Sequence, residues 1–423
     1  MKILAIETSC DDSGIAILEI SGTKNQPRLL ANLISSQVKL HAKWGGVVPM
    51  LAKREHQRNL TPLLTKALKE AKLLKIQKPE SKTQELNSKL KILKEEILER
   101  EDSLVKKLIP FLKKYQNPDF DYIAITHGPG LEPALWVGVN FARALSFFWD
   151  IPLLPINHIE GHIAANFILE DKVSEIPNFQ IPRPQRLSVA LAGAAIFNKN
   201  HKAILPAICL VVSGGHTQII LIKEFGDYKI IGETRDDAAG EAFDKVAKML
   251  DLGYPGGPAI SKLAEKWKSQ IPNPKSQIPN HQLPRPMMHS GDFDFSFSGL
   301  KTAVLYRLQK MTKKEIKKST PAIAAEFEQA VVDVLTKKTI AAAKEYGAKS
   351  LWLSGGVAAN QSLRHVLEKS AQENNLDFSA PENQYCTDNA AMIAQAAYQK
   401  LQNNQAQEIS WQELKAQANL RIS

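Results

Sequence analysis

The chain has 423 residues, of which 44% are hydrophobic and 23% charged, as in an ordinary soluble enzyme with room for two domains. Its three cysteines lie far apart, which excludes a disulfide framework and a CxxC metal knuckle. The formal net charge of +10 favours a polyanionic partner such as nucleic acid, although a lysine-rich solvated surface accounts for it nearly as well.

The first residues are apolar, but Glu7 interrupts the run too early for a signal peptide, and no later run reaches the length of a membrane span. Free cysteines fit a reducing compartment. We therefore expect a cytoplasmic protein without membrane contact.

Residues 3–19 contain two runs rich in β-forming residues around a polar turn, 8–14. This pattern predicts a β-hairpin with an acidic, hydroxyl-rich tip. Such a tip can bind phosphate oxygens, and Asp11 or Asp12 can hold a cation or accept a proton. A solvated hairpin turn explains the residues equally well.

A loop with a Gly-Gly pair, 36–49, leads to a predicted helix over about 50–74. Residues 75–118 resemble a helical insertion. Its apolar residues recur at heptad-like spacing: Leu86, Leu90, Leu93, Ile97 and Leu104. We expect one long helix or a helical hairpin that packs on its neighbour; an arm that touches a nucleic acid or another partner is the alternative.

A strand at 122–126, a glycine turn at 128–131 and a helix over 137–148 follow the strand–turn–helix rhythm of an α/β protein. The apolar run 149–156 predicts a second buried strand, and a helix begins after it. On this helix His158 and His162 lie at i and i+4, on one face, where both imidazoles can bind one metal ion.

Glu160 lies between the two histidines and points away from that face, unlike the glutamate of the His-Glu-x-x-His motif of zinc peptidases. The spacing alone is a weak signal. A pair of capping or core histidines remains the alternative.

The turn Ser213-Gly214-Gly215 lies between two apolar strands, and Ser354-Gly355-Gly356 follows a third. Glycines in such turns allow the backbone to approach a ligand closely. Two such turns and the N-terminal hairpin predict two similar lobes with a nucleotide cleft between them. The fold class is α/β, two-lobed, like that of actin, Hsp70 and the sugar kinases.

A helix predicted near 239–248 has an acidic first turn, and on it Asp244 can accept hydrogen bonds from a ribose, with Glu241 on the same face. Asp388 stands at the head of another helix, where a plain N-cap is the alternative role. Segments 170–205 and 268–290 are predicted surface insertions; the second contains a seven-residue duplication.

Together these motifs resemble the bacterial tRNA N6-adenosine threonylcarbamoyltransferase family, in the family's order and over nearly the whole chain. The stretches that carry the resemblance are 7–11, 45–49, His158-x₃-His162, 212–217, 237–245, 254–258, 295–302, 355–357 and 386–389.

The resemblance implies transfer of threonylcarbamoyl from threonylcarbamoyl-adenylate to N6 of the adenosine 3′ of the anticodon in ANN-decoding tRNAs, with release of AMP. It implies that His158, His162 and Asp388 bind one Fe²⁺ or Zn²⁺ ion. Asp11 would assist the attack by the adenine amine, together with Asp12, where the family often has glutamate. The implied adenylate-binding residues are Val211, Val212, Ser213, Gly214, Gly215, Asp244, Gly257 and Asn360.

The expected lobes are residues 1–157 and 158–389, followed by a C-terminal helix and tail, 390–423, that packs back on the first lobe. By resemblance, the partners are tRNA, a shorter inactive paralogue and a small P-loop ATPase. Three other functions stay open: an ATP-dependent kinase or carbamoyltransferase acting on a small molecule, a metalloprotease, and a non-enzymatic scaffold.

Overall fold

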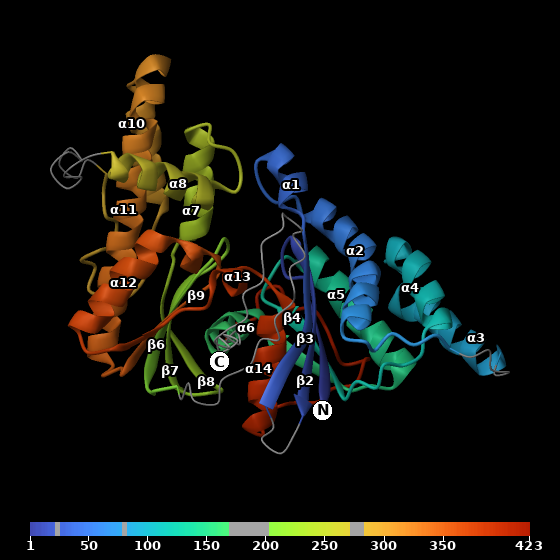
Figure 1. Ribbon diagram of the computed structural model, residues 1–423. Helices are drawn as coiled ribbons and strands as arrows, with labels where there is room; N and C mark the ends of the chain where they lie inside the picture. Colours follow the sequence, from blue (N-terminus) through green and yellow to red (C-terminus); the bar gives the residue numbers. More distant parts are fainter. Residues whose placement is uncertain (22–25, 78–82, 169–202, 271–282) are drawn as a thin grey trace, which may run out of the picture.

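The structure, a computed structural model, describes residues 1–21, 26–77, 83–168, 203–270 and 283–423. Its strands form two five-stranded sheets that contain both parallel and antiparallel pairs. Figure 1 shows the two sheets side by side, each with helices of its own. The chain therefore has the two-lobed α/β fold that the repeated strand–turn pattern predicts.

The sheet of the first lobe has the order β3-β2-β1-β4-β5. Side chains alternate between its faces with the period of two that a strand requires. Leu4 and Ile6 of β1 pack in the core beneath the outer helices, whereas Ile3 and Ala5 pack against the opposite helix, α14. The elements of this lobe are β1 (Lys2–Glu7), β2 (Asp12–Ser21), β3 (Gln26–Ser36), α1 (Val38–His41), η1 (Ala42–Trp44), α2 (Pro49–Glu70), β4 (Tyr122–Gly128), α5 (Glu132–Trp149), β5 (Leu153–Asn157), α6 (His158–Ala164), η3 (Ala165–Phe167) and α14 (Ala390–Gln402).

The sheet of the second lobe has the order β10-β9-β6-β7-β8. Its central strand β6 is buried at every residue, because both of its faces are covered. Ile208 and Leu210 face the large helical core of this lobe, and Cys209 and Val211 face the side of α6. The elements are β6 (Ala207–Val212), β7 (Thr217–Glu224), β8 (Asp227–Glu233), α7 (Ala239–Met249), α8 (Gly256–Ser269), α10 (Ser298–Gln309), α11 (Lys313–Glu345), β9 (Ser350–Ser354), η4 (Gly356–Ala359), α12 (Gln361–Glu373), β10 (Asp377–Ser379) and α13 (Asn383–Cys386).

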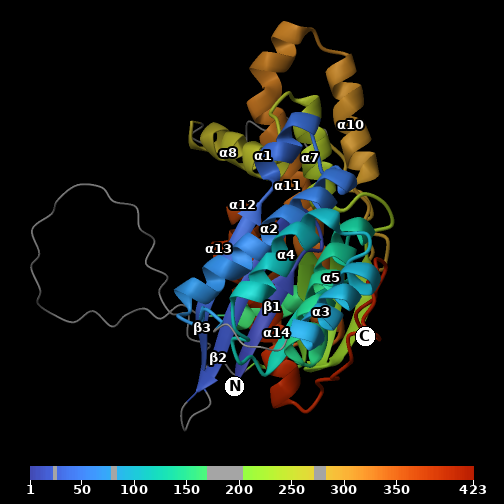
Figure 2. The ribbon, with the colours of Figure 1, turned by 90° about the vertical axis from the view of Figure 1, so that its right-hand side faces the viewer.

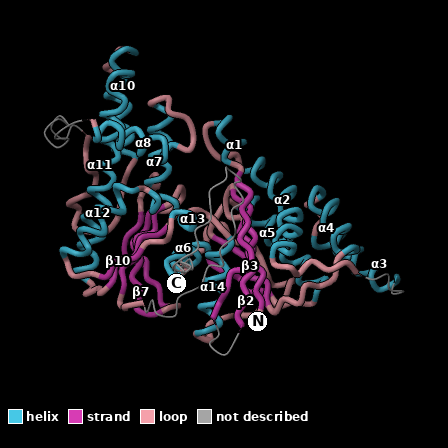
Figure 3. Tube along the Cα trace, in the orientation of Figure 1, coloured by secondary structure: helices cyan, strands magenta, loops and turns pink. Residues whose placement is uncertain are grey.

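Helices α6 and α14 lie between the two sheets (Figure 3) and contact each other. Ile159 and Ile163 of α6 pack on the second sheet, and Ala164 packs with α14 on the first. This pair of helices therefore connects the cores of the two lobes.

The predicted helical insertion consists of α3 (Thr83–Ile92), a π-helical turn (Leu93–Ile97) and α4 (Asp102–Lys114). Leu90, Leu93, Ile97 and Leu104 are buried in the core of the first lobe. The heptad-like spacing thus marks two helices packed on a neighbour, with a break between them near Leu98.

Two expected boundaries are wrong. The apolar run 149–156 is not one strand: Trp149 ends α5, Asp150 caps that helix in the left-handed region, and β5 begins at Leu153. A short apolar run does not separate a helix end from a buried strand, because both bury the same side chains.

The predicted surface insertion 268–290 is also too long. Helix α8 extends to Ser269, and Leu283 is buried in the second core with its backbone N–H donating to Glu326. Residues 271–282 lie outside the described residues, as does nearly all of the predicted insertion 170–205, of which 169–202 are not described.

After α14 the tail crosses both lobes. Ile409 pairs with Leu153 of β5, and Leu414 is buried in the first core. Arg421 then forms an ion pair of 2.9 Å with Glu233 of β8, and Ile422 packs in the second-lobe cluster. Within the described ranges, no helix is long and apolar enough to cross a membrane.

Candidate active site

The end of β5 sets the two histidines in place. Asn157 is the N-cap of α6, and its side-chain oxygen accepts hydrogen bonds from the backbone N–H groups of Ile159 and Glu160. The cap fixes the first turn of the helix at the strand end. His158 is therefore the first helical residue and His162 follows one turn later, with both side chains on the same face.

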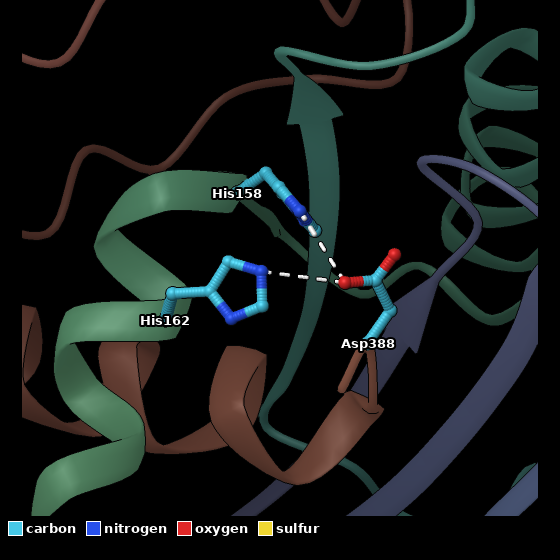
Figure 4. Close-up of side chains that lie close together, drawn as sticks. All are labelled: His158, His162 and Asp388. Atoms are coloured by element: carbon cyan, nitrogen blue, oxygen red, sulfur yellow. Dashed lines mark ion pairs between the residues drawn. The ribbon is translucent and has the colours of Figure 1, made fainter. Parts of the chain in front are cut away.

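Asp388 comes from the far end of the sequence to meet them. Its Oδ1 lies 3.5 Å from His158 Nε2 and 3.3 Å from His162 Nε2, and the two imidazole rings are 4.6 Å apart (Figure 4). Asp388 is not the N-cap of α14, since Asn389 fills that role by accepting from Met392 N–H. The carboxylate is therefore free of capping and faces the histidines.

Glu7 orients His158 from behind. This carboxylate is fully buried at the end of β1 and accepts from the hydroxyl of Thr126 at 2.6 Å and from the backbone N–H of Ser9. His158 Nδ1 lies 3.2 Å from Glu7 Oε2. Because a carboxylate only accepts, Nδ1 carries a hydrogen, and the other ring nitrogen, Nε2, faces Asp388.

The two carboxylates near the histidines change the pKa values of the cluster. Burial opposes charge on His158, yet the carboxylates of Asp388 and Glu7 raise its pKa to about 9. Burial would raise the pKa of Asp388, but the charge of His158 and the contact with His162 hold it below its usual range. Burial lowers the pKa of His162, and the charge of His158 lowers it further. One proton therefore sits on His158 between two carboxylates.

The three side chains fit a divalent metal ion. Their ligand atoms lie within 4.8 Å of one another. Tetrahedral ligands about 2.1 Å from a zinc ion stand about 3.4 Å apart, close to the two His–Asp distances above. In the described part of the chain neither ring nitrogen of the buried His162 has an aligned hydrogen bond. Two imidazoles and one carboxylate suit Zn²⁺ or Fe²⁺ and leave coordination positions for a substrate.

Glu160 turns away from this cluster, as its helical position predicts. Its carboxylate forms a 3.0 Å ion pair with Lys400 and accepts from Tyr228. It therefore cannot act as the general base of a metalloprotease at the histidine pair.

Asp11 and Asp12 lie in the turn from β1 to β2, beside the cluster. Burial raises the pKa of Asp12 to about 7. Burial and then the charge of Asp388 raise the pKa of Asp11. Oxygens of Ser9, Asp11 and Asp12 are buried without a hydrogen-bond partner among the described residues. Buried oxygens without a partner are costly, so these three can accept hydrogen bonds from a ligand or from water.

The predicted adenylate-binding residues gather on the second lobe across from this turn. Gly355, in the left-handed region, packs against the carbonyl of Val212, and Gly240 packs against that of Ser213, so the two Ser-Gly-Gly turns and the start of α7 form one surface. By contrast, a side chain at Gly214, Gly215 or Gly257 would meet nothing within 4 Å. These three backbones line open space, where a ligand can approach them.

Two residues of the predicted set are engaged with protein. Asp244 accepts a 2.7 Å hydrogen bond from the backbone N–H of Gly256 at the start of α8. Asn360 caps α12 and also donates to Ser261 and Glu328. Both side chains hold helices that border the open space.

Sequence reasoning missed Glu7 and His216 as site residues. Glu7 carried a signal, since an acid at the end of an apolar strand needs a partner when it is buried. Burial and then the neighbouring His158 and His162 lower the pKa of His216 to about 4, so it is a neutral donor or acceptor beside the cluster.

The chain matches the family model for tRNA N6-adenosine threonylcarbamoyltransferase over residues 28–78, 97–181 and 188–395. Relatives that carry this name include a Bacillus subtilis protein, 39% identical over 94% of this chain and 89% of that protein, and a Thermosipho africanus protein, 38% identical over 94% of each. A third, from Persephonella marina, is 38% identical over 96% of this chain and 91% of that protein.

Similarity to solved structures is weaker. Full-length HypF in its phosphate- and nucleotide-bound form gives a TM-score of 0.48 at 13% identity, over 96% of this chain and 47% of that chain. The activator of the 2-hydroxyisocaproyl-CoA dehydratase from Clostridium difficile, with bound ADPNP, gives 0.42 at 12% identity, over 97% and 100%.

Proposed function

The chain belongs to the tRNA N6-adenosine threonylcarbamoyltransferase family, and from this premise we propose how its residues carry out the transfer. The enzyme moves a threonylcarbamoyl group to N6 of a tRNA adenosine, the one 3′ of the anticodon in ANN-decoding tRNAs. Threonylcarbamoyl-adenylate is the donor and AMP the leaving group. The observation that carries the proposal is the convergence of His158, His162 and Asp388 beside Asp11 and Asp12.

His158, His162 and Asp388 would hold one Fe²⁺ or Zn²⁺ ion, with Glu7 fixing the ring of His158. When bound, the ion would supply Lewis-acid polarisation of the donor at its acyl-phosphate end. The metal triad lies at the junction of the lobes, and the Ser213–Gly215 turn, Asp244, Gly257 and Asn360 border the space for the adenylate.

The adenine amine attacks the carbamoyl carbon of the donor, a C–N bond forms, and the bond from that carbon to the phosphate oxygen breaks. The amine loses one proton. Asp12, whose pKa is about 7, takes that proton, and Asp11 orients the amine. The shorter Asp12 in place of glutamate retains this role because its carboxylate is already buried beside Asp11.

Basic surface and net charge +10 support binding to tRNA phosphates, with steep salt dependence. The enzyme acts in the cytoplasm, together with a shorter inactive paralogue and a P-loop ATPase. A small-molecule kinase does not require a His–His–Asp metal site. The position of Glu160, which faces away from the histidines, disfavours a metalloprotease.

The test is transfer of labelled threonylcarbamoyl from synthetic adenylate to unmodified ANN-decoding tRNA, with and without the two partner proteins. We expect wild type to form the modified nucleoside and His158→Ala to lose roughly 100-fold or more of the rate, because a metal ligand is gone. His365→Ala, an exposed histidine on α12, is the matched control and should retain full activity.

Equal rates for wild type and His158→Ala would remove the metal from the mechanism. No transfer by wild type under either condition would overturn the proposed function and favour the small-molecule kinase.

A further inference from the structure

An exposed tryptophan stands on the loop between β3 and α2. Trp44 is 65% exposed at the end of η1, and Met50, at the start of α2, is exposed to the same extent. Among the described residues, large apolar side chains are mostly buried in the cores of the two lobes. A tryptophan presented to solvent is therefore a candidate contact surface.

The exposure of Trp44 is built into the loop. His41 is fully buried directly before η1, where its Nε2 lies 3.1 Å from Gln37 Oε1 and its Nδ1 accepts from the backbone N–H of Val48 at 3.2 Å. Gly45, in the left-handed region at φ 69°, ends η1. The buried histidine ties both ends of the loop together, so the indole is held outward at little cost in conformational entropy on binding.

This loop lies between the proposed catalytic turn and α7 of the second lobe. Gln37 N–H donates to the carbonyl of Asp11 at 3.2 Å, which joins the start of the loop to the proposed catalytic turn. From Gln37 to Trp44 the helical rise is on the order of 10 Å. On the other side, a Cβ placed on Gly45 would lie 3.5 Å from Lys248 Nζ of α7, in the second lobe. Figures 1 and 2 both show α1 beside α7.

The charges on the loop that carries Trp44 are of one sign. Residues 36–54 contain no aspartate or glutamate. Lys39 and Lys43 on the loop are exposed, and so is Lys248 of α7. An aromatic plane flanked by exposed cations is the arrangement that binds unpaired bases and their phosphates.

We propose that Trp44 stacks on an unpaired anticodon-loop base adjacent to the target adenosine, and that Lys39, Lys43 and Lys248 contact the neighbouring phosphates. The inference rests on the proposed function, since it takes the RNA from there. The loop is hydrogen-bonded to the aspartate turn and lies beside Lys248, so an RNA loop that presents its adenosine to Asp11 and Asp12 can contact Trp44, and the flanking lysines match its phosphates. A protein partner docking on Trp44 and Met50 is the other outcome that the test must separate.

The experiment measures binding of a fluorescent anticodon stem-loop RNA and the kcat and KM for full-length tRNA, in wild type, Trp44→Ala, Trp44→Phe and Met50→Ala. Stacking on one base predicts a 5- to 100-fold weaker affinity and a correspondingly higher KM for Trp44→Ala, at nearly unchanged kcat. Trp44→Phe should recover most of the affinity, because a benzene ring still stacks. Met50→Ala matches Trp44 in exposure and should bind RNA as wild type does.

Stem-loops with one abasic nucleotide on either side of the adenosine identify the base. At the stacked position, Trp44→Ala should add no further loss to that caused by the abasic site, as two changes to one contact are not additive. Melting temperatures should be equal for all variants, since both side chains are exposed.

RNA affinity and KM unchanged in Trp44→Ala, while wild type modifies tRNA, would overturn the inference and leave the proposed function standing. Loss that is additive with every abasic site, or equal in Trp44→Ala and Met50→Ala, would also overturn the proposed stacking of Trp44 on one base. Failure of wild type to modify tRNA at all is the separate failure of the proposed function.

Discussion

At the scale of the residue, the site depends on buried polar groups that would be unfavourable without a ligand or an orienting partner. Glu7 is the clearest example. It is wholly buried, and its three acceptor contacts place it between Ser9, Thr126 and His158. A carboxylate in this position fixes the tautomer of a metal-binding histidine.

Glu7→Gln tests that role. The amide has the same volume as the carboxylate but no charge, and its NH₂ group faces a group that itself donates a hydrogen bond. We therefore expect a 10- to 100-fold weaker affinity for Co²⁺ or Zn²⁺. Competition with a chromogenic chelator measures the affinity, and the visible spectrum of bound Co²⁺ reports changes in ligand geometry. Thr126→Val, which removes only the hydroxyl contact to Glu7, is the control and should lose less. An affinity within twofold of wild type would assign Glu7 a role in folding only.

Asp12 makes the metal-free protein sensitive to pH. Its pKa is about 7 in the folded state and 3.8 when exposed, so between these values the folded state binds more protons than the unfolded state. The contribution of Asp12 to the free energy of unfolding therefore falls as pH rises through this range, by up to about 1.4 kcal/mol per pH unit.

Denaturant unfolding of chelator-treated wild type and Asp12→Asn at pH 5, 6 and 7 measures the effect. The difference in unfolding free energy should move in favour of Asp12→Asn as pH rises. A difference that stays constant over the range would mean that Asp12 titrates normally and does not serve as a base tuned near neutral pH.

At the scale of the element, the sequence predicts which segments are helix or strand better than it predicts where they end. The Gly-Gly turns, the His158–His162 helix and β1–β2 follow from turn chemistry and period alone. The ends of α5 and α8 do not, because the caps at Asp150 and the packing of Leu283 come from tertiary contacts. The meeting of Asp388 with His158 came from resemblance; residue spacing alone did not place them together.

The packing of the helical insertion indicates that it stabilises the first lobe. Leu93 is fully buried in the first-lobe core, whereas Leu86 of α3 is only partly buried. Leu93→Ala should lower the free energy of unfolding by about 2–5 kcal/mol, and Leu86→Ala by less, since cavity formation scales with burial.

Thermal or urea unfolding measures both changes, and tRNA affinity should stay the same in each. Small, equal losses for the two variants would indicate that the insertion is undocked. A drop in tRNA affinity with normal stability would instead make it an arm that contacts RNA.

At the scale of the whole molecule, the site is assembled from distant parts of the chain. Glu7 lies in the first strand, the histidines in the middle and Asp388 near the end, and the proposed adenylate-binding residues belong to the second lobe. A metal ion bound by His158, His162 and Asp388 would close a chain loop between residues 158 and 388 and would add to stability by restricting the unfolded chain. Composition and charge predicted a soluble enzyme with an anionic partner, but only the topology brings these groups together.

The crossing tail has a consequence for synthesis on the ribosome. Leu414 completes the first core and Ile422 the second cluster, so neither lobe has its full set of apolar contacts while residues 405–423 are still inside the exit tunnel. Until these residues emerge, apolar surface around β5 and β8 stays exposed on the nascent chain, and a chaperone can bind it. Slow translation of the codons for residues 405–423 would lengthen this interval. Substitutions in this segment would lower the yield of folded protein before they change the catalytic rate.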